Sequence, residues 1–68
     1  MREREVVDIH EVSAAKDGWR VLVYQTPQPL FLPASRTELY QRLERAGRDD
    51  LELTLTWDSE SLEILEAE

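Results

Sequence analysis

The chain has 68 residues, of which 41% are hydrophobic and 34% charged, with a formal net charge of −7 and no cysteine. A chain of this length forms one domain with a small core, and it has no disulfide or thiolate zinc site to stabilise that core. No apolar run approaches the roughly 20 residues of a membrane-spanning helix, and the N-terminal residues lack the apolar stretch of a signal peptide. We therefore expect one cytoplasmic domain over residues 1–68, without membrane contact.

The first two predicted strands form a hairpin. Residues Glu5–Val12 are rich in β-branched side chains, and Trp19–Thr26 follows after a turn at Asp17 and Gly18. Apolar side chains occupy both faces of the second strand, which predicts an interior position in the sheet. In the first strand two apolar sets compete for the inward face, so its orientation stays open. These sets are Val7 with Ile9 and Val6 with Val12.

The next segment contains the three prolines of the chain. Pro27 and Pro29 end the second strand, because proline cannot donate to a β ladder. The short apolar run Leu30–Leu32 before Pro33 forms either a brief edge strand or a buried crossover.

A helix is predicted between Ser35 and Gly47. Ser35 and Glu38 have the spacing of a capping box, in which each side chain accepts a hydrogen bond from the backbone amide of the other. Gly47 occupies the position at which many helices end in a left-handed residue. The apolar stripe of this helix is narrow, which is typical of a helix that packs on a sheet. The stripe consists of Leu39, Leu43 and Ala46.

A second hairpin follows the helix. Leu51–Trp57 alternates strictly between apolar and polar residues, which predicts a half-buried antiparallel strand. A turn at Asp58–Ser61 leads to a returning strand that contains Leu62, Ile64 and Leu65. The chain therefore predicts an α+β fold of order β-β-short β-α-β-β, in which two β-hairpins form an antiparallel sheet and one helix packs on one face. A small curled β-barrel with the helix as a lid is the alternative.

The inventory of side chains gives little support for catalysis. The chain has one histidine, no cysteine nucleophile and no glycine-rich phosphate loop. His10 is close to Asp8 and Glu11, but Glu11 lies on the opposite strand face and no second histidine is available for a metal site. Trp19 and Trp57 fit packing at the ends of strands better than stacking on nucleic-acid bases. We therefore expect a protein that is not an enzyme and uses neither a metal nor a cofactor.

Uneven charge is the main indication of a binding surface. Residues 36–48 contain four arginines and two glutamates, whereas residues 49–68 contain eight acidic residues and no basic one. Guanidinium groups in a row on a helix bind phosphate or carboxylate, and an acidic hairpin favours a basic partner. The candidate partner-binding residues are Arg36, Arg42, Arg45 and Arg48 on the helix and Glu52, Glu60 and Glu63 on the hairpin.

The same charges also have a purely structural interpretation. Glu38 with Arg42 and Glu44 with Arg48 have the spacing of favourable ion pairs along a helix. An acidic hairpin surface keeps a small protein soluble without any further role.

Two segments resemble the carbon storage regulator family. Trp19–Val23, the proline-containing turn after it and Arg36–Leu43 are similar to the late strands and closing helix of that family. The resemblance implies RNA binding through an arginine at the position of Arg36. It covers about a third of the chain. The N-terminal strand motif and the glycines of the family are missing, and the acidic hairpin is additional, so we do not assign the chain to this family.

These observations predict a non-enzymatic accessory or regulatory module that binds another protein of unknown identity, with homodimer formation as a further expectation. The alternative is a role linked to nucleic acid, in one of two forms. Either the helix arginines contact RNA or DNA, or the acidic hairpin imitates nucleic acid toward a basic protein. The net charge of −7 disfavours direct contact with nucleic acid.

Overall fold

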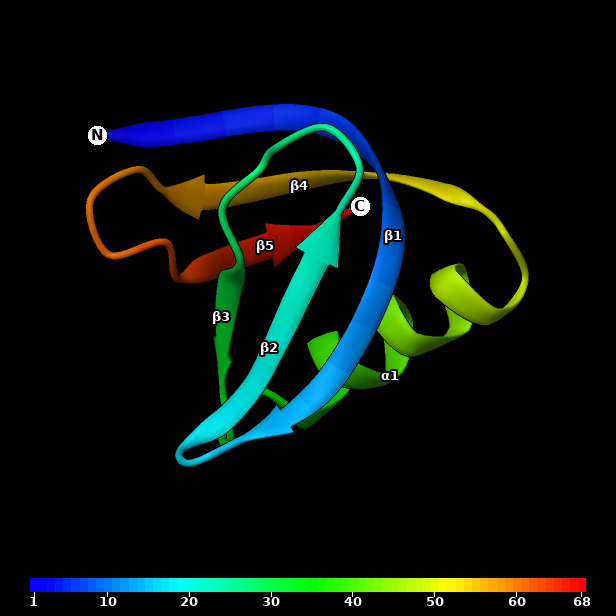
Figure 1. The fold of residues 1–68 in the computed structure, drawn as a ribbon, viewed down its shortest axis with the longest axis horizontal. Coiled ribbons are helices and arrows are strands. Elements are labelled where there is room, and N and C mark those ends of the chain that lie inside the picture. Colours follow the sequence, from blue (N-terminus) through cyan, green and yellow to red (C-terminus); the bar gives the residue numbers. More distant parts are fainter.

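The structure is a computed structural model that describes residues 1–68. Its five strands form one antiparallel sheet of order β3-β2-β1-β4-β5, against which the single helix packs (Figure 1). The elements are β1 (Arg2–Ala15), β2 (Gly18–Val23), β3 (Leu30–Pro33), α1 (Thr37–Arg48), β4 (Glu52–Asp58) and β5 (Ile64–Ala67). The predicted α+β fold and order of elements are confirmed, and β2 takes the interior position that its two apolar faces predict.

β1 is the longest strand and belongs to both halves of the sheet. Its first part, Arg2–Asp8, pairs with β4, and its second part, Ile9–Ala15, pairs with β2. The register shifts between Ile9 and Glu11, so that His10 is an extra residue in β1. A bulge of this kind bends a strand and increases its twist. β1 accordingly curves from one half of the sheet into the other (Figure 1).

The register shift also settles the orientation of β1. Val7 and Ile9 point into the core, whereas Val6 is 52% exposed. Beyond His10 the alternation changes phase, because a shift of one residue exchanges the two faces of a strand. Val12 therefore also packs against the core. The two apolar sets that compete in the sequence each supply part of the inward face.

The core lies between the two halves of the curved sheet and under α1. It contains 13 buried residues, and all of them are hydrophobic. β4 contributes Leu53, Leu55 and Trp57, as its alternation predicts, and α1 contributes Leu43 and Ala46. Burial of this apolar surface is the main favourable contribution to folding.

The two outer strands approach each other without closing the sheet. In β3 the backbone amide of Phe31 donates to the carbonyl oxygen of Leu62 at 2.8 Å, and Phe31 forms an isolated bridge with Glu63. One bridge does not make a ladder, so β3 and β5 remain the two ends of the sheet. The alternative of a closed barrel is therefore wrong, although the sheet is strongly curled.

The helix begins later than the capping-box pattern predicts. Arg36 occupies the N-cap position before Thr37, and no side chain caps the helix. The amide of Arg36 donates to the carbonyl oxygen of Pro33 at 3.0 Å, so a tight turn precedes the helix and places Ser35 one position too early. The predicted capping box of Ser35 and Glu38 is not formed.

The helix also extends past the glycine that was expected to end it. Gly47 lies inside α1, which ends at Arg48, and the left-handed residue beyond the helix is Asp50, with a φ of 56°. A Cβ atom on Gly47 would lie 3.1 Å from Cγ2 of Ile9. The missing side chain of this glycine lets α1 approach β1 closely.

The structure also shows how the two short apolar segments, one before the helix and one at the end of the chain, are folded. Leu30–Pro33 is an edge strand that pairs with β2. The returning strand of the second hairpin starts at Ile64, because Leu62 has a left-handed φ of 64° and belongs to the turn. α1 is too short and too polar to span a membrane.

Candidate functional site

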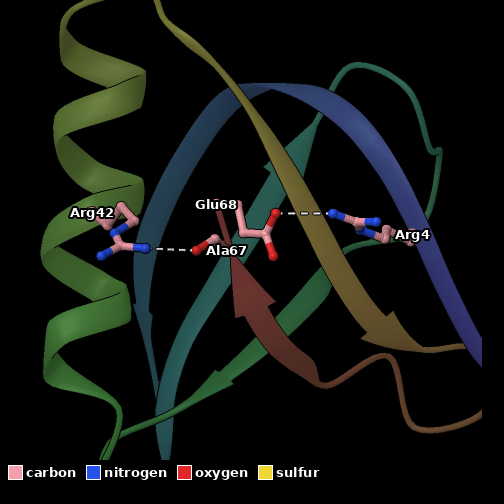
Figure 2. Close-up of polar contacts among 4 residues, drawn as sticks. All are labelled: Arg4, Arg42, Ala67 and Glu68. Atoms are coloured by element: carbon pink, nitrogen blue, oxygen red, sulfur yellow. Dashed lines mark hydrogen bonds and ion pairs between the residues drawn. The ribbon is translucent and has the colours of Figure 1, made fainter.

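Contacts within the chain divide the four predicted helix arginines into two that bind the sheet and two that do not. Nη2 of Arg36 donates to the carbonyl oxygen of Leu65 at 2.9 Å, and Nη1 of Arg42 donates to the carbonyl oxygen of Ala67 at 2.7 Å. Figure 2 shows the second contact, which reaches from α1 to the end of β5. Both acceptors are main-chain oxygens, so these two arginines have a structural role. For Arg36 this role competes with the RNA contact that the family resemblance implies.

The two arginine contacts cover the outer edge of β5. Thr54 and Glu68 exchange backbone hydrogen bonds of 3.0 and 2.9 Å between β4 and the residue after β5. Since hydrogen bonding alternates along an antiparallel ladder, the carbonyl group of Ala67 points away from β4. The carbonyl of Leu65 lies at the register shift beside it. The guanidinium groups from α1 therefore occupy acceptors that an unpaired strand edge would expose.

The remaining helix arginines are more accessible. Arg48 pairs with Glu44, with 3.8 Å between Nη2 and Oε1 and with both side chains exposed. This confirms one of the two predicted helix pairs. The other, Glu38 with Arg42, is not formed because Arg42 reaches across to β5. Arg45 is exposed and makes no side-chain hydrogen bond or ion pair.

The three predicted glutamates do not form one acidic patch. Glu52 begins β4, and Glu60 lies in the turn beyond its other end. The strand between them spans about 20 Å at the usual rise per residue. Glu63 is half-buried, and its carbonyl oxygen accepts from the amide of Asp58 at 2.9 Å. Glu52 is therefore separated by the length of β4 from the turn that contains Glu60.

Asp58 fixes the turn between β4 and β5. Its Oδ1 accepts hydrogen bonds from the amides of Ser61 at 3.0 Å and Glu60 at 2.8 Å. Hydrogen bonds to the ionised carboxylate, from Ser61 first and Glu60 second, hold the pKa of Asp58 below its ordinary value. The hydrogen bonds of the turn therefore account for the lowered pKa of Asp58, and no catalytic role is needed to explain it.

The tryptophans pack within the fold, as predicted. Trp57 is buried in the core. Trp19 stacks on Tyr40 of α1, with ring centroids 4.2 Å apart and an angle of 12° between the ring planes. A hydrogen bond with Glu44 is the main cause that raises the pKa of the Tyr40 hydroxyl. The stack attaches the β1–β2 hairpin to the helix.

The only histidine makes a local contact on the surface. Nδ1 of His10 lies 2.9 Å from the hydroxyl oxygen of Tyr24, and the two rings are tilted by 56°. No group of three or more histidine, aspartate and glutamate side chains lies close enough together to hold a metal ion.

An additional candidate surface lies along the first half of β1. The amide of Ser59 donates to the carbonyl oxygen of Met1 at 2.7 Å, which places Met1 in a hydrogen-bonded pair beside β4. The register continues from there, so alternation directs the backbone groups of Arg2, Arg4 and Val6 away from β4. No hydrogen bond from elsewhere in the chain reaches these groups. We call the unpaired N–H and C=O groups of these three residues the β1 open edge.

The open edge ends at Asp8, where β2 and its following loop take over. The amide of Tyr24 donates to the carbonyl oxygen of Asp8 at 3.1 Å. The Gln25 side chain both accepts from the Asp8 amide at 2.8 Å and donates to its carboxylate at 2.9 Å. The amide group of Gln25 thus takes the place of a further strand residue and closes the ladder.

Side chains beside the open edge are accessible. Val6 is 52% exposed as a whole residue and the side chain of Arg4 is 62% exposed. A shallow hollow is lined by Arg4, Glu5, Val6 and Thr54. Arg4 forms an ion pair with Glu68, 2.9 Å from Nη2 to Oε2, on the side toward β5 (Figure 2). A surface pair of this kind contributes at most about 1 kcal/mol. The ion pair leaves the edge of β1 that faces away from β4 accessible.

The sequence prediction missed this surface because it started the strand at Glu5. Residues 2–5 contain no apolar side chain, and pairing with β4 makes them a strand. Their strict alternation, Arg-Glu-Arg-Glu, is the signal that indicates a strand with two charged faces.

No family model, curated protein or solved structure matches the chain.

Proposed function

We propose that the protein is a cytoplasmic, non-enzymatic module that binds another protein as an accessory or regulatory component. The observation that best supports this proposal is the β1 open edge. Three residues there present alternating N–H and C=O groups with no partner in the chain. An extended polypeptide supplies complementary groups at the same spacing and binds such an edge as an additional strand.

The other sheet edges support the same proposal by contrast. β3 meets the segment at Leu62 and Glu63, and β5 is covered by the arginines of α1. An exposed edge promotes unwanted association unless it is protected or used. Among the strand edges of this sheet, the β1 open edge is therefore the one that remains available to an added strand.

The role linked to nucleic acid stays a prediction with weaker support. Arg36 and Arg42 donate hydrogen bonds to carbonyl oxygens of β5, and Arg48 has an intrahelical partner. Contact with phosphates would therefore depend mainly on Arg45. Imitation of nucleic acid requires grouped carboxylates, and Glu52 and Glu60 are separated by the length of β4.

Homodimer formation also stays a prediction. Light scattering at micromolar concentration tests it directly, because the chain mass is 8.0 kDa. A stable mass near that value refutes the homodimer without affecting the proposal that the module binds a different protein.

The proposed function is tested by affinity capture from the source cell with three forms of the protein. Val6→Pro removes the outward N–H of the open-edge residue nearest Asp8, whereas Val6→Thr keeps it as a matched control. We expect a protein partner to be retained by wild type and Val6→Thr, lost with Val6→Pro and resistant to nuclease. Failure to retain any protein that is lost with Val6→Pro, or loss of retention after nuclease treatment, would refute the proposal.

A further inference from the structure

Building on the protein-binding function, we propose that the β1 open edge selects one kind of partner: an extended peptide strand in which basic and acidic residues alternate. The alternation of charge along β1 carries this inference. It identifies the chemistry of the partner, which the unpaired backbone groups alone do not.

Each face of β1 carries one sign of charge beside the open edge. Arg2 and Arg4 share one face with Val6, and Glu3 and Glu5 share the other, because successive side chains of a strand point to opposite faces. All five side chains are exposed. None of them is needed to fill the core. Of the four charged side chains, Arg4 has an exposed ion-pair partner, Glu68, and all four remain accessible to an added strand.

A strand that pairs with this edge places one side chain opposite each of these residues. Directly opposed Cβ atoms lie about 5 Å apart, close enough for opposite charges to attract and like charges to repel. The best partner therefore has acidic residues opposite Arg2 and Arg4, basic residues opposite Glu3 and Glu5, and an apolar residue opposite Val6. Read along the partner strand, this is an alternation of acid and base.

Partner strands with other simple charge patterns pair less favourably with the open edge. A uniformly acidic strand meets the arginines and is repelled by the glutamates, and a uniformly basic strand has the reverse problem. An apolar strand covers four charges without pairing them.

A second copy of the chain is a poor partner for the same reason. In a symmetric antiparallel pair, the residues with outward backbone groups lie opposite one another. Arg2 and Arg4 would then meet arginine or Val6, and Glu3 and Glu5 would meet glutamate or Val7. The edge therefore rejects its own copy in this arrangement and accepts a different chain.

The direct test uses two short peptides of identical composition with blocked ends. In Val-Lys-Glu-Lys-Glu the charges alternate, and in Val-Glu-Lys-Lys-Glu they do not. With valine opposite Val6, the first peptide meets all four charges of wild type favourably, and the second meets two favourably and two unfavourably. Because a peptide of five residues forms few main-chain hydrogen bonds and binds weakly, the titration of the protein with each peptide is followed by nuclear magnetic resonance of the isotope-labelled protein.

We expect the alternating peptide to bind wild type about tenfold more tightly than the other peptide at low salt. The changes in chemical shift should be concentrated at the amides of Arg2, Arg4 and Val6. Val6→Pro should weaken binding of the alternating peptide. Added salt should reduce the difference between the peptides. Equal affinities, absence of binding, or shifts located elsewhere would overturn the proposal.

Exchange of two neighbouring charges provides a sharper control at constant net charge. In Arg4→Glu/Glu5→Arg the preference should reverse toward Val-Glu-Lys-Lys-Glu. In the neutral pair Arg4→Gln/Glu5→Gln, which serves if the exchanged form does not fold, the two peptides should bind equally. If a folded variant keeps the peptide preference of wild type, the proposed charge pattern is wrong, and the protein-binding function is not affected. The protein-binding function fails separately, when affinity capture retains no partner sensitive to Val6→Pro.

Discussion

Nη1 of Arg42 lies 2.7 Å from the carbonyl oxygen of Ala67, and this contact joins the helix to the outer strand of the sheet. Arg42→Ala should lower the free energy of unfolding by about 1 kcal/mol, because a charged donor to the edge of β5 is lost. Arg45→Ala is the matched control on the same helix, and its effect should stay within about 0.5 kcal/mol. Urea denaturation measures both values, and equal losses would contradict the structural role of Arg42.

The two glycines should respond differently to a methyl group. A Cβ on Gly18 would overlap the carbonyl oxygen of Leu32 and lie 2.8 Å from the backbone nitrogen of Ala34. Since backbone atoms cannot move aside cheaply, Gly18→Ala should cost at least about 2 kcal/mol and separate β3 from β2. On Gly47 the close neighbour is the Ile9 side chain, and alanine also favours the helix by about 1 kcal/mol.

Gly47→Ala should therefore change the free energy of unfolding by less than about 1 kcal/mol. Thermal unfolding followed by circular dichroism compares the two variants. A larger loss for Gly47→Ala than for Gly18→Ala would show that the helix approach, and not the β2–β3 pairing, is the less tolerant contact.

Ser35→Ala tests where the helix begins. Because no side chain caps α1, this change should alter the free energy of unfolding by less than about 0.5 kcal/mol. A capping serine would give a loss of about 1 kcal/mol. Chemical denaturation distinguishes these values, and the larger one would restore Ser35 as the N-cap residue.

The turn at Asp58 should make stability sensitive to acid. The pKa of Asp58 in the folded protein is lower than its ordinary value of 3.8, so the unfolded chain takes up the proton first as the pH falls. The stabilisation is fully present above the ordinary pKa and is lost as the pH falls through the lower pKa of the folded state. Asp58→Asn should remove this part of the acid sensitivity.

The measurement is the urea midpoint of wild type and Asp58→Asn between about pH 2 and pH 7. The variant should be less stable than wild type at neutral pH, and the gap should narrow in acid. Parallel curves over the whole range would show that the turn hydrogen bonds do not depend on the charge of Asp58.

Sequence patterns predict most of this fold because local rules and packing agree there. The alternation that buries Leu53, Leu55 and Trp57 is visible in the sequence, as is the helix stripe with Leu43 and Ala46. The register shift at His10 is not visible, because no residue type marks it and it depends on how β1 pairs with both β2 and β4.

The candidate site was harder to predict, because pairing between distant segments creates it. Arg36 and Arg42 look like a free row on the helix until β5 supplies their acceptors. Arg2 and Arg4 become strand residues only through β4. Charge counts locate the basic and acidic groups, but they do not say which groups the fold itself uses.

The pairing of β1 also sets the order in which the chain can assemble. Its second half meets β2 across a short turn, a hairpin that forms within microseconds. Its first half waits for β4, because Asp8 pairs with Glu52 and a long loop must close first. During synthesis this segment leaves the ribosome early and has no partner strand on either side. The first half of β1 therefore joins the sheet only after most of the chain, including β4, has been synthesised.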